Sequence, residues 1–290
     1  MISVVIPTYN RQHTIVRAVN SVLAQTYRDL EVIVVDDCSS DDTRSVVEQI
    51  EDSRVRYACL DKNSGACAAR NMGISLSRGE YIAFQDSDDA WYPDKLAEQL
   101  AALEQSGAHI VFCGFEKLWG NNMRLVHPQN RSSGFCSPED LLMESLASTQ
   151  TILGTAEAVR SVMFDPFLPR MQDYDFIIRA VQNYRVYYLD RVLVSVYEQA
   201  DSITAGKRSY QKRLDITEKL LAKYPQFRTE YPRWELTMLK TIAHCQVMLK
   251  QDAAPILKEI YKKEKSLANW GKLILYRLGL LYFLFDRADR

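Results

Sequence analysis

The chain has 290 residues, of which 47% are apolar, and its 36 basic and 37 acidic residues leave a net charge of -1. This apolar content is enough for a large buried core and excludes an intrinsically disordered chain. The balanced charge gives no basic excess of the kind that binds nucleic acid. The six cysteines form no CxxC pair and no cluster with histidine, which favours reduced thiols and argues against a zinc site.

Both ends of the chain bear on its location. An apolar run from the first residue to Pro7 lacks the basic start and the small-residue cleavage site of a secretory signal. The most apolar C-terminal stretch, residues 267–285, contains Asn269, Lys272 and Arg277. It therefore falls short of the roughly 20 apolar residues that a membrane-spanning helix needs. We expect a cytoplasmic protein that does not span a bilayer.

The first 115 residues alternate short β-branched runs with segments of helical period, which is typical of a largely parallel sheet covered by helices. Strands are predicted at Ile2–Ile6, Leu30–Val35, Val55–Ala58, Tyr81–Phe84 and Ile110–Phe115. The helices between them are predicted from Ile15 to Leu23, from Thr43 to Ile50, from Ala66 to Ser77 and from Pro93 or Asp94 to Gln105.

The pattern changes after residue 115. Residues 116–137 are rich in Asn, Gly, Ser and Arg, which predicts a hairpin or a mobile loop. Three helices and two strands follow, near 138–146, 155–162 and 174–183, and near 186–189 and 192–197. From residue 207 onward only helical periods occur, with breaks at Pro225, Pro232 and Pro255. We therefore predict an α/β domain over residues 1–206 and a helical region over residues 207–290.

Polar clusters follow three of the predicted strands, at Pro7–Asn10, at Asp36 and Asp37, and at Asp86–Asp89. Ligands of open α/β sheets bind beyond the carboxyl ends of the strands, so the three clusters are expected to meet in one crevice. Carboxylates two residues apart, such as Asp86 and Asp88, suit Mg²⁺ or Mn²⁺ that carries a diphosphate. An isolated DxD can also be a simple turn after a strand.

Four segments together resemble the family-two inverting glycosyltransferases: VVIPTYNR at Val4–Arg11, VVDDCSSDDT at Val34–Thr43, NSGACAARNMGI at Asn63–Ile74, and the DSDD run from Asp86. The resemblance covers about residues 1–204. It implies a GT-A fold, that is, a Rossmann-like sheet of the nucleotide-diphospho-sugar transferases, here followed by a C-terminal helical extension. It also implies a nucleotide-sugar donor, UDP being favoured, a divalent metal and inversion at the anomeric carbon. Residues 1–115 would bind the nucleotide sugar and residues 116–206 the acceptor.

The resemblance also assigns donor-binding residues. Pro7, Thr8 and Tyr9 would line the base and ribose pocket, and Asp37 would accept a hydrogen bond from the uracil N–H. Arg70 would contact the phosphates, for which a guanidinium offers paired donors. The alternative for Pro7, Thr8, Tyr9 and Asp37 is that they only form turns at the ends of strands. The alternative for Arg70 is that it is an exposed structural arginine.

For the metal, the resemblance assigns Asp88 as a ligand and Asp86 as the donor-side acid, which touches either the ribose or the metal. Asp89 would cap or brace the turn. The expected cofactor is Mn²⁺ or Mg²⁺.

An inverting transfer needs one base for the acceptor hydroxyl. The family places this base in an acidic pair, usually Glu then Asp, at the start of a helix, and the matching pair here is Gln172 and Asp173. We assign Asp173 as the base, although a helix N-cap would also explain it. Gln172 departs from the family pattern. The loop Tyr197–Thr204 departs as well, because it lacks the Arg and His that many relatives carry before the Ser-x-Thr, here Ser202 and Thr204.

Trp91, Tyr92 and Trp119 are candidates for stacking on an acceptor sugar, with Gln172 as a further acceptor-side candidate, whereas core packing explains aromatic residues at least as often. The C-terminal stretch places Trp270, Leu273, Ile274, Leu281 and Phe285 toward one side, among basic residues. This predicts peripheral membrane contact through residues 267–290, which would serve a lipid-linked saccharide acceptor at the inner face of the plasma membrane. Packing on the α/β domain and dimerisation are the alternatives.

The sequence thus predicts a hexosyl- or N-acetylhexosaminyltransferase of surface polysaccharide or glycan synthesis, such as that of capsule or O-antigen. A nucleotide-sugar or glycan-binding relative without turnover is the alternative, kept open by Gln172 and by the missing loop histidine. A dinucleotide oxidoreductase is disfavoured because no GxGxxG follows the first strand, where Pro7, Thr8 and Tyr9 stand instead.

Overall fold

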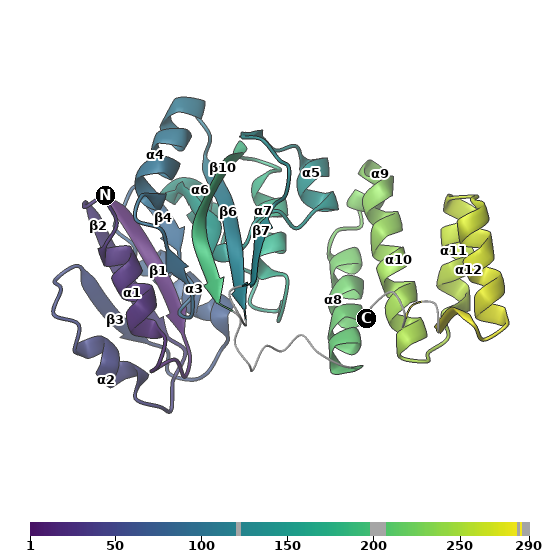
Figure 1. Cartoon of the computed structure of the whole chain (residues 1–290), viewed down its shortest axis with the longest axis horizontal. Coiled ribbons are helices and arrows are strands. Elements are labelled where there is room, and N and C mark those ends of the chain that lie inside the picture. Colours follow the sequence, from purple (N-terminus) through teal and green to yellow (C-terminus); the bar gives the residue numbers. More distant parts are fainter. Residues whose placement is uncertain (120–122, 198–206, 283–284, 286–290) are drawn as a thin grey trace. The chain divides into compact units, whose positions relative to one another are not determined.

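The computed structural model describes residues 1–119, 123–197, 207–282 and 285, which form two compact units (Figure 1). We call residues 1–199 the sheet unit and residues 200–290 the helical unit. The sequence placed the boundary after residue 206, at the end of a segment, 198–206, that lies outside the described residues.

The sheet unit is built on one mixed sheet, whose strands lie in the order β3-β2-β1-β4-β9-β6-β10-β5, with β7 on β6 and β8 on β10. Strands β3, β2, β1 and β4 are parallel to one another, and β9 runs antiparallel to both of its neighbours, β4 and β6. The strands are β1 (Ile2–Thr8), β2 (Leu30–Asp36), β3 (Val55–Cys59), β4 (Tyr81–Phe84), β5 (Ala90–Trp91), β6 (Ile110–Trp119), β7 (Met123–His127), β8 (Gly134–Phe135), β9 (Ile152–Thr155) and β10 (Val186–Tyr197).

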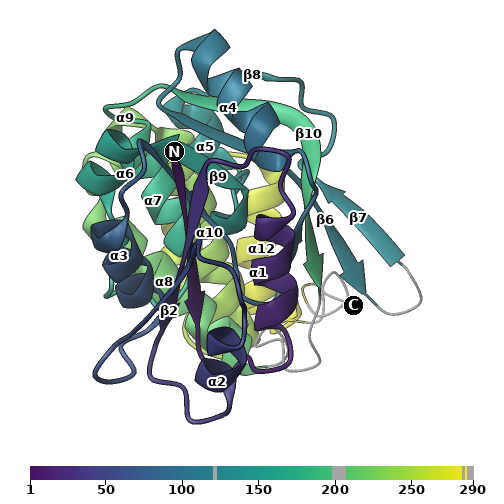
Figure 2. The same ribbon diagram turned by 90° about the vertical axis from the view of Figure 1, so that its left-hand side faces the viewer.

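Helices cover both faces of this sheet, and Figure 2 shows α1 and α3 on opposite sides of β1 and β2. Successive side chains of a strand point to opposite faces, so β1 and β2, which are buried along their whole length, supply both cores. Ile2, Val4 and Ile6 join α1 in one core, and Ile33 and Val35 join α3 in the other. The helical elements are α1 (Ile15–Leu23), α2 (Thr43–Glu48), α3 (Ala66–Leu76), α4 (Lys95–Ser106), α5 (Pro138–Met143), η1 (Thr149–Thr151), α6 (Ala156–Val162) and α7 (Gln172–Ala180).

Helix α3 lies unusually close to β1. A Cβ atom on Gly73 would stand 2.3 Å from Cγ1 of Val5, which is far inside van der Waals contact. Only glycine permits this close approach of α3 to β1. The distance between α3 and the sheet also determines where Arg70, one turn earlier in α3, lies relative to the sheet.

The α/β fold with a helical C-terminal region was predicted correctly, and the differences lie in the second half of the sheet unit. Residues 123–127 form β7, which pairs with a β6 that extends to residue 119, so the hairpin, one of the two alternatives predicted for residues 116–137, is confirmed for this part. The two strands predicted near 186–197 are one strand, β10, whose register shifts between Leu189 and Val194. Strand β9 was not predicted, because four residues that lead directly into a helix carry too short a pattern.

The helical unit consists, in its described part, of α8 (Lys207–Lys223), α9 (Phe227–Glu230), α10 (Pro232–Met248), α11 (Ala254–Lys263) and α12 (Leu267–Arg277). The predicted breaks are confirmed: Pro225 separates α8 from α9, Pro232 opens α10, and Pro255 stands in the first turn of α11. Among the described residues, no helix has the length and apolar content that crossing a membrane would require.

Candidate active site

A pocket of about 230 Å³ lies at the carboxyl ends of β1, β2 and β4, where the polar clusters were expected to meet. We call it the strand-end pocket. The convergence of the three strand ends is confirmed, because each contributes side chains to the lining. The lining residues are Pro7, Thr8, Tyr9, Arg11, Asp37, Ala66, Ala69, Arg70, Asp86, Ser87 and Asp88.

Asp37 holds the start of α3 in place. Its two carboxylate oxygens accept hydrogen bonds from the backbone N–H groups of Ser64, at 2.6 Å, and Gly65, at 2.8 Å. Gly65 has a φ of 89°, a conformation that favours glycine. Asp37 therefore has a structural role as well as a place in the pocket wall, and its bonds position the helix that carries Arg70.

Arg70 joins two segments of the site that are far apart in the sequence. One terminal nitrogen of its guanidinium donates to Oδ1 of Asp86 at 2.8 Å, and the other donates to Oε1 of Gln172 at 2.7 Å. The residue is only 6% exposed. The resemblance assigned Arg70 to the donor phosphates, and the structure shows that both terminal nitrogens already have protein partners.

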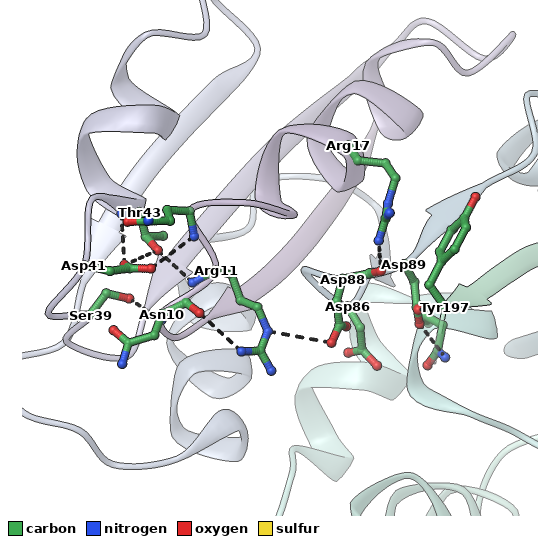
Figure 3. Close-up of polar contacts among 12 residues, drawn as sticks. Asn10, Arg11, Arg17, Ser39, Asp41, Thr43, Asp86, Asp88, Asp89 and Tyr197 are labelled. Atoms are coloured by element: carbon green, nitrogen blue, oxygen red, sulfur yellow. Dashed lines mark hydrogen bonds and ion pairs between the residues drawn. The ribbon is translucent and has the colours of Figure 1, made fainter. Parts of the chain in front are cut away.

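Asp86 and Asp88 stand side by side at the pocket, and two arginines reach Asp88 (Figure 3). The guanidinium of Arg11 lies 3.6 Å from a carboxylate oxygen of Asp88, and Arg17 donates to the backbone carbonyl of Asp88. Burial and the charge of Asp86 raise the pKa of Asp88, while Arg11 opposes the rise. The pair is thus an acidic centre in which each carboxylate has an arginine beside it, Arg70 at Asp86 and Arg11 at Asp88.

Asp89 points away from this pair. Its carboxylate accepts from the side-chain amide of Gln150 at 3.0 Å. It also accepts from the backbone N–H of Tyr197 at 3.1 Å (Figure 3). Burial and the charges of Asp86 and Asp88 raise the pKa of Asp89 to about 8. Asp89 therefore braces the acidic turn against η1 and β10, in keeping with the role that the resemblance gave it.

The acidic centre can accommodate a divalent ion. Among the described residues, no three His, Cys, Asp or Glu side chains form a complete metal-binding group. Mg²⁺ and Mn²⁺ do not require one, because they usually keep waters and share their coordination with substrate phosphates. Asp86 and Asp88 supply two hard oxygen ligands on the wall of a pocket, and a bound cation would favour the charged form of Asp88, whose pKa burial and the charge of Asp86 raise.

Asp173 lies in the first turn of α7, next to Gln172 and so to the Arg70 bridge. Its Oδ1 accepts from the N–H of Tyr174 at 2.8 Å. Burial raises the pKa of Asp173, a shift that this hydrogen bond and the charge of Arg70 oppose. Met171, the N-cap of α7, has a φ of 56°, and such strain is frequent at functional sites.

Trp91 does not offer a face for an acceptor sugar. It is 5% exposed, its indole N–H donates to the carbonyl of Gln150 at 3.1 Å, and the ammonium of Lys95 lies 3.8 Å from its ring centre. This placement corrects the stacking assignment in favour of core packing. Tyr92 is 38% exposed and its hydroxyl bonds Glu116, so it keeps a free surface.

Arg11 and Arg17 were missed by the sequence analysis. Arg11 lies in the VVIPTYNR segment, which was the available signal, but the partner of Arg17 is 71 residues away and leaves no local pattern. Ser202 and Thr204 lie outside the described residues, as does the side chain of Trp119.

Comparison with known proteins extends these observations. The profile of glycosyl transferase family 2 matches residues 3–153. A putative colanic acid biosynthesis glycosyl transferase of Escherichia coli K12, WcaA, is 30% identical over 244 residues, covering 78% of this chain and 86% of that protein. The chain belongs to glycosyl transferase family 2. It is a glycosyltransferase, and it resembles proteins of polysaccharide biosynthesis.

Two further matches add detail. An E. coli protein named UDP-Glc:alpha-D-GlcNAc-diphosphoundecaprenol beta-1,3-glucosyltransferase, WfgD, is 37% identical over 131 residues, which span 44% of this chain and 52% of that protein. The crystal structure of S. aureus TarS 1-349 in complex with UDP-GlcNAc superimposes with a TM-score of 0.65 at 20% identity, covering 96% of this chain and 92% of that one. This likeness confirms the predicted GT-A fold.

Proposed function

We propose that this glycosyltransferase transfers a sugar from a UDP-sugar to a saccharide acceptor, with inversion, in the synthesis of a surface polysaccharide or glycan. The observation that carries the proposal is the Arg70 bridge, which holds the acidic centre of the strand-end pocket and the first turn of α7 in one hydrogen-bonded unit. The proposed metal ligand Asp86 and Gln172, the neighbour of the proposed base, thus bind the same arginine.

The donor would occupy the strand-end pocket. Pro7, Thr8 and Tyr9 would contact the base and ribose, and Asp37 keeps acceptor capacity for an imide N–H, since each of its oxygens has a second lone pair. The hydroxyl of Thr8, a residue that lines this pocket, is buried without a hydrogen-bond partner. Residues 1–115 would then form the donor half of the domain and residues 116–206 the acceptor half.

Asp88, together with Asp86, would hold Mn²⁺ or Mg²⁺. The bound ion would neutralise the negative charge of the departing nucleoside diphosphate. Arg11, 3.6 Å from Asp88, would add a positive charge on the same side of the pocket.

Asp173 would act as the general base. The acceptor hydroxyl oxygen would form a bond to the anomeric carbon while the bond from that carbon to the diphosphate breaks, and the hydroxyl proton would pass to the carboxylate of Asp173. The raised pKa of Asp173 suits this role, because a stronger base gains more from accepting the proton.

The acceptor is proposed to be lipid-linked. One relative bears the name of an enzyme that acts on a diphosphoundecaprenol-linked sugar, although only 52% of its length aligns. Tyr92 and Gln172 are the described candidates for acceptor contacts, and the protein would work at the inner face of the plasma membrane.

Titration of the full chain with UDP, GDP, dTDP and CMP, each with and without Mn²⁺, tests the donor assignment. We expect a metal-dependent rise in the melting temperature with UDP. Asp88→Asn should abolish the metal dependence, while Asp94→Asn, the same change at an exposed position, should preserve it. A response to GDP or dTDP instead of UDP would refute UDP as the donor nucleotide.

A further inference from the structure

The two units carry opposite net charges, which the overall value of -1 conceals. Residues 1–199 hold 18 basic and 27 acidic residues, a net charge of -9, whereas residues 200–290 hold 18 basic and 10 acidic residues, a net charge of +8. Such an asymmetry within one chain is typical of proteins with a basic region that meets an anionic partner.

Helix α12 exposes an apolar stripe in this basic unit. Leu267 is 86% exposed, Trp270 51% and Leu278 64%, and Ile274 between them is partly exposed. The four residues follow one another at intervals of three or four, so they share one side of the helix. We call them the α12 stripe.

The opposite side of α12, which packs inside the helical unit, carries polar groups beside the half-buried Leu273. Asn269 is 4% exposed, and its amide donates to the carbonyl and to the carboxylate of Glu264. The hydroxyl of Tyr276 accepts from the N–H of Ala253 at 3.0 Å, and Lys272 lines a small cavity with residues of α10 and α11. A helix of a water-soluble domain normally has the reverse arrangement, so the stripe requires an apolar contact of its own.

Cations stand at both ends of the stripe. Lys265 precedes it and Arg277 lies beside Leu278, and both are exposed. Lys262 and Lys263 are also exposed in the last turn of α11. A row of leucine, tryptophan and isoleucine between basic residues matches the chemistry of the boundary between lipid headgroups and acyl chains, where tryptophan is enriched.

We propose that the α12 stripe inserts into the surface of an anionic phospholipid bilayer, with Lys265 and Arg277 against the headgroups. The proposal extends the proposed function, because membrane binding would bring the protein to a lipid-linked acceptor. Only this biological purpose rests on the proposed function, and the membrane binding itself does not. The proposal also changes the set of residues predicted to contact the membrane. Leu281 was predicted on the same side as Trp270, but it is 1% exposed and belongs to the interior of the helical unit.

The sheet unit is a poorer partner for the stripe. Its exposed large apolar side chains come from separate segments, namely Tyr9, Val16, Tyr92, Leu125, Phe135, Met143 and Phe167. Among the described residues, no two of these side chains belong to the same helix or strand, so no element of the sheet unit presents a row of them that matches the stripe. An anionic bilayer supplies negative charge for the basic residues and an apolar interior into which the stripe can insert.

Co-sedimentation of the full chain with vesicles tests the proposal. Vesicles of phosphatidylcholine alone are compared with vesicles that also contain phosphatidylglycerol, at low and at high salt. We expect about tenfold more binding to the anionic vesicles, and a loss of most of this difference at high salt. Neither donor nor acceptor sugar is present, so failure of the transferase assignment would leave this result unchanged.

The double variant Leu267→Ser/Trp270→Ser should lose about tenfold or more of the vesicle binding, whereas Trp270→Phe should retain it. Phe167→Ser is the matched control, because Phe167 is 83% exposed but lies in the sheet unit. Circular dichroism verifies that the double variant is folded. Equal binding of the double variant and the wild type would overturn the proposal, as would equal binding to neutral and anionic vesicles. Self-association that the double variant abolishes, without vesicle binding, would overturn it in favour of a second copy.

Discussion

In the sheet unit, β1 and β2 bury every side chain, and the polar residues follow where these strands end. In the helical unit, α12 buries Asn269 and exposes Leu267 and Trp270. The first arrangement directs its chemistry into a pocket whose residues are fixed by hydrogen bonds. The second directs apolar surface outward. We infer from this contrast that the sheet unit is organised for catalysis and the helical unit for contact with another surface. Variants in each unit test this inference.

The largest effect is expected at the proposed base. Asp173→Asn should lower the rate of transfer by about 10²- to 10⁴-fold, because the amide cannot accept the acceptor proton. Donor affinity, measured by titration with UDP, should stay within about twofold of the wild type, since only the base is altered. Full transfer activity in this variant would exclude Asp173 as the base.

Arg70→Lys tests whether the bridge positions the site or binds the donor. A lysine ammonium cannot serve two partners in the fixed geometry of a guanidinium, so we expect kcat to fall about 10- to 100-fold with a smaller change in KM. Gln172→Ala in the same background should add little, because the two residues act together. A rise in KM at constant kcat would show instead that Arg70 contacts the donor directly.

Glu31→Gln tests the buried polar contacts that Glu31 makes from β2. Burial would raise the pKa of Glu31, but hydrogen bonds from Ser3, Arg56 and the N–H of Arg78 outweigh it and hold the pKa below its usual value. The stabilisation is therefore present at neutral pH and is lost as the pH falls through the folded-state pKa. We expect a loss of about 1–2 kcal/mol in unfolding free energy at pH 7, shrinking below about pH 4.

Urea denaturation at a series of pH values measures this effect. Glu48→Gln, which removes an exposed partner of Arg44, is the control and should leave the midpoint unchanged. A Glu31→Gln deficit that persists undiminished at low pH would contradict the assignment.

The smallest effect is expected at the α12 stripe. Leu267→Ser should change the unfolding free energy by less than about 0.5 kcal/mol, because its side chain is already exposed. The same substitution at Leu257, which is 3% exposed, should cost about 3 kcal/mol or more. Thermal denaturation of both variants provides the measurement, and a large loss at Leu267 would show that the stripe is covered within the chain.

The sequence predicted which strand ends meet in the strand-end pocket, because local patterns identify the polar clusters that follow the buried strands. Asp37, Asp86 and Asp88 each come directly after a buried strand, and parallel strands bring such positions to one edge. The resemblance supplied the roles of these residues, which the pattern of burial alone does not contain.

What the sequence did not predict depends on contacts between distant segments. Asp89 bonds Gln150 and Tyr197, which are 61 and 108 residues away, and Arg70 bonds Gln172 across 102 residues. For Trp91 the sequence left sugar stacking and core packing open, and the pairing of its short strand with β10 draws the ring into the core. Periodicity also grouped Leu281 with Trp270 on one side of the C-terminal stretch, whereas Leu281 is buried and Trp270 is exposed, because tertiary packing decides which side is covered.

Because Gly73 has no side chain, α3 can approach β1 closely, and the position of Arg70 depends on this distance. The helix can rest on Val5 only while position 73 carries no methyl group, and Arg70 lies one turn earlier on the same helix. Any larger residue there would lift α3 from the sheet and carry the guanidinium away from Asp86. The spacing between α3 and β1 therefore sets the contact between Arg70 and Asp86, and with it the geometry of the proposed active site.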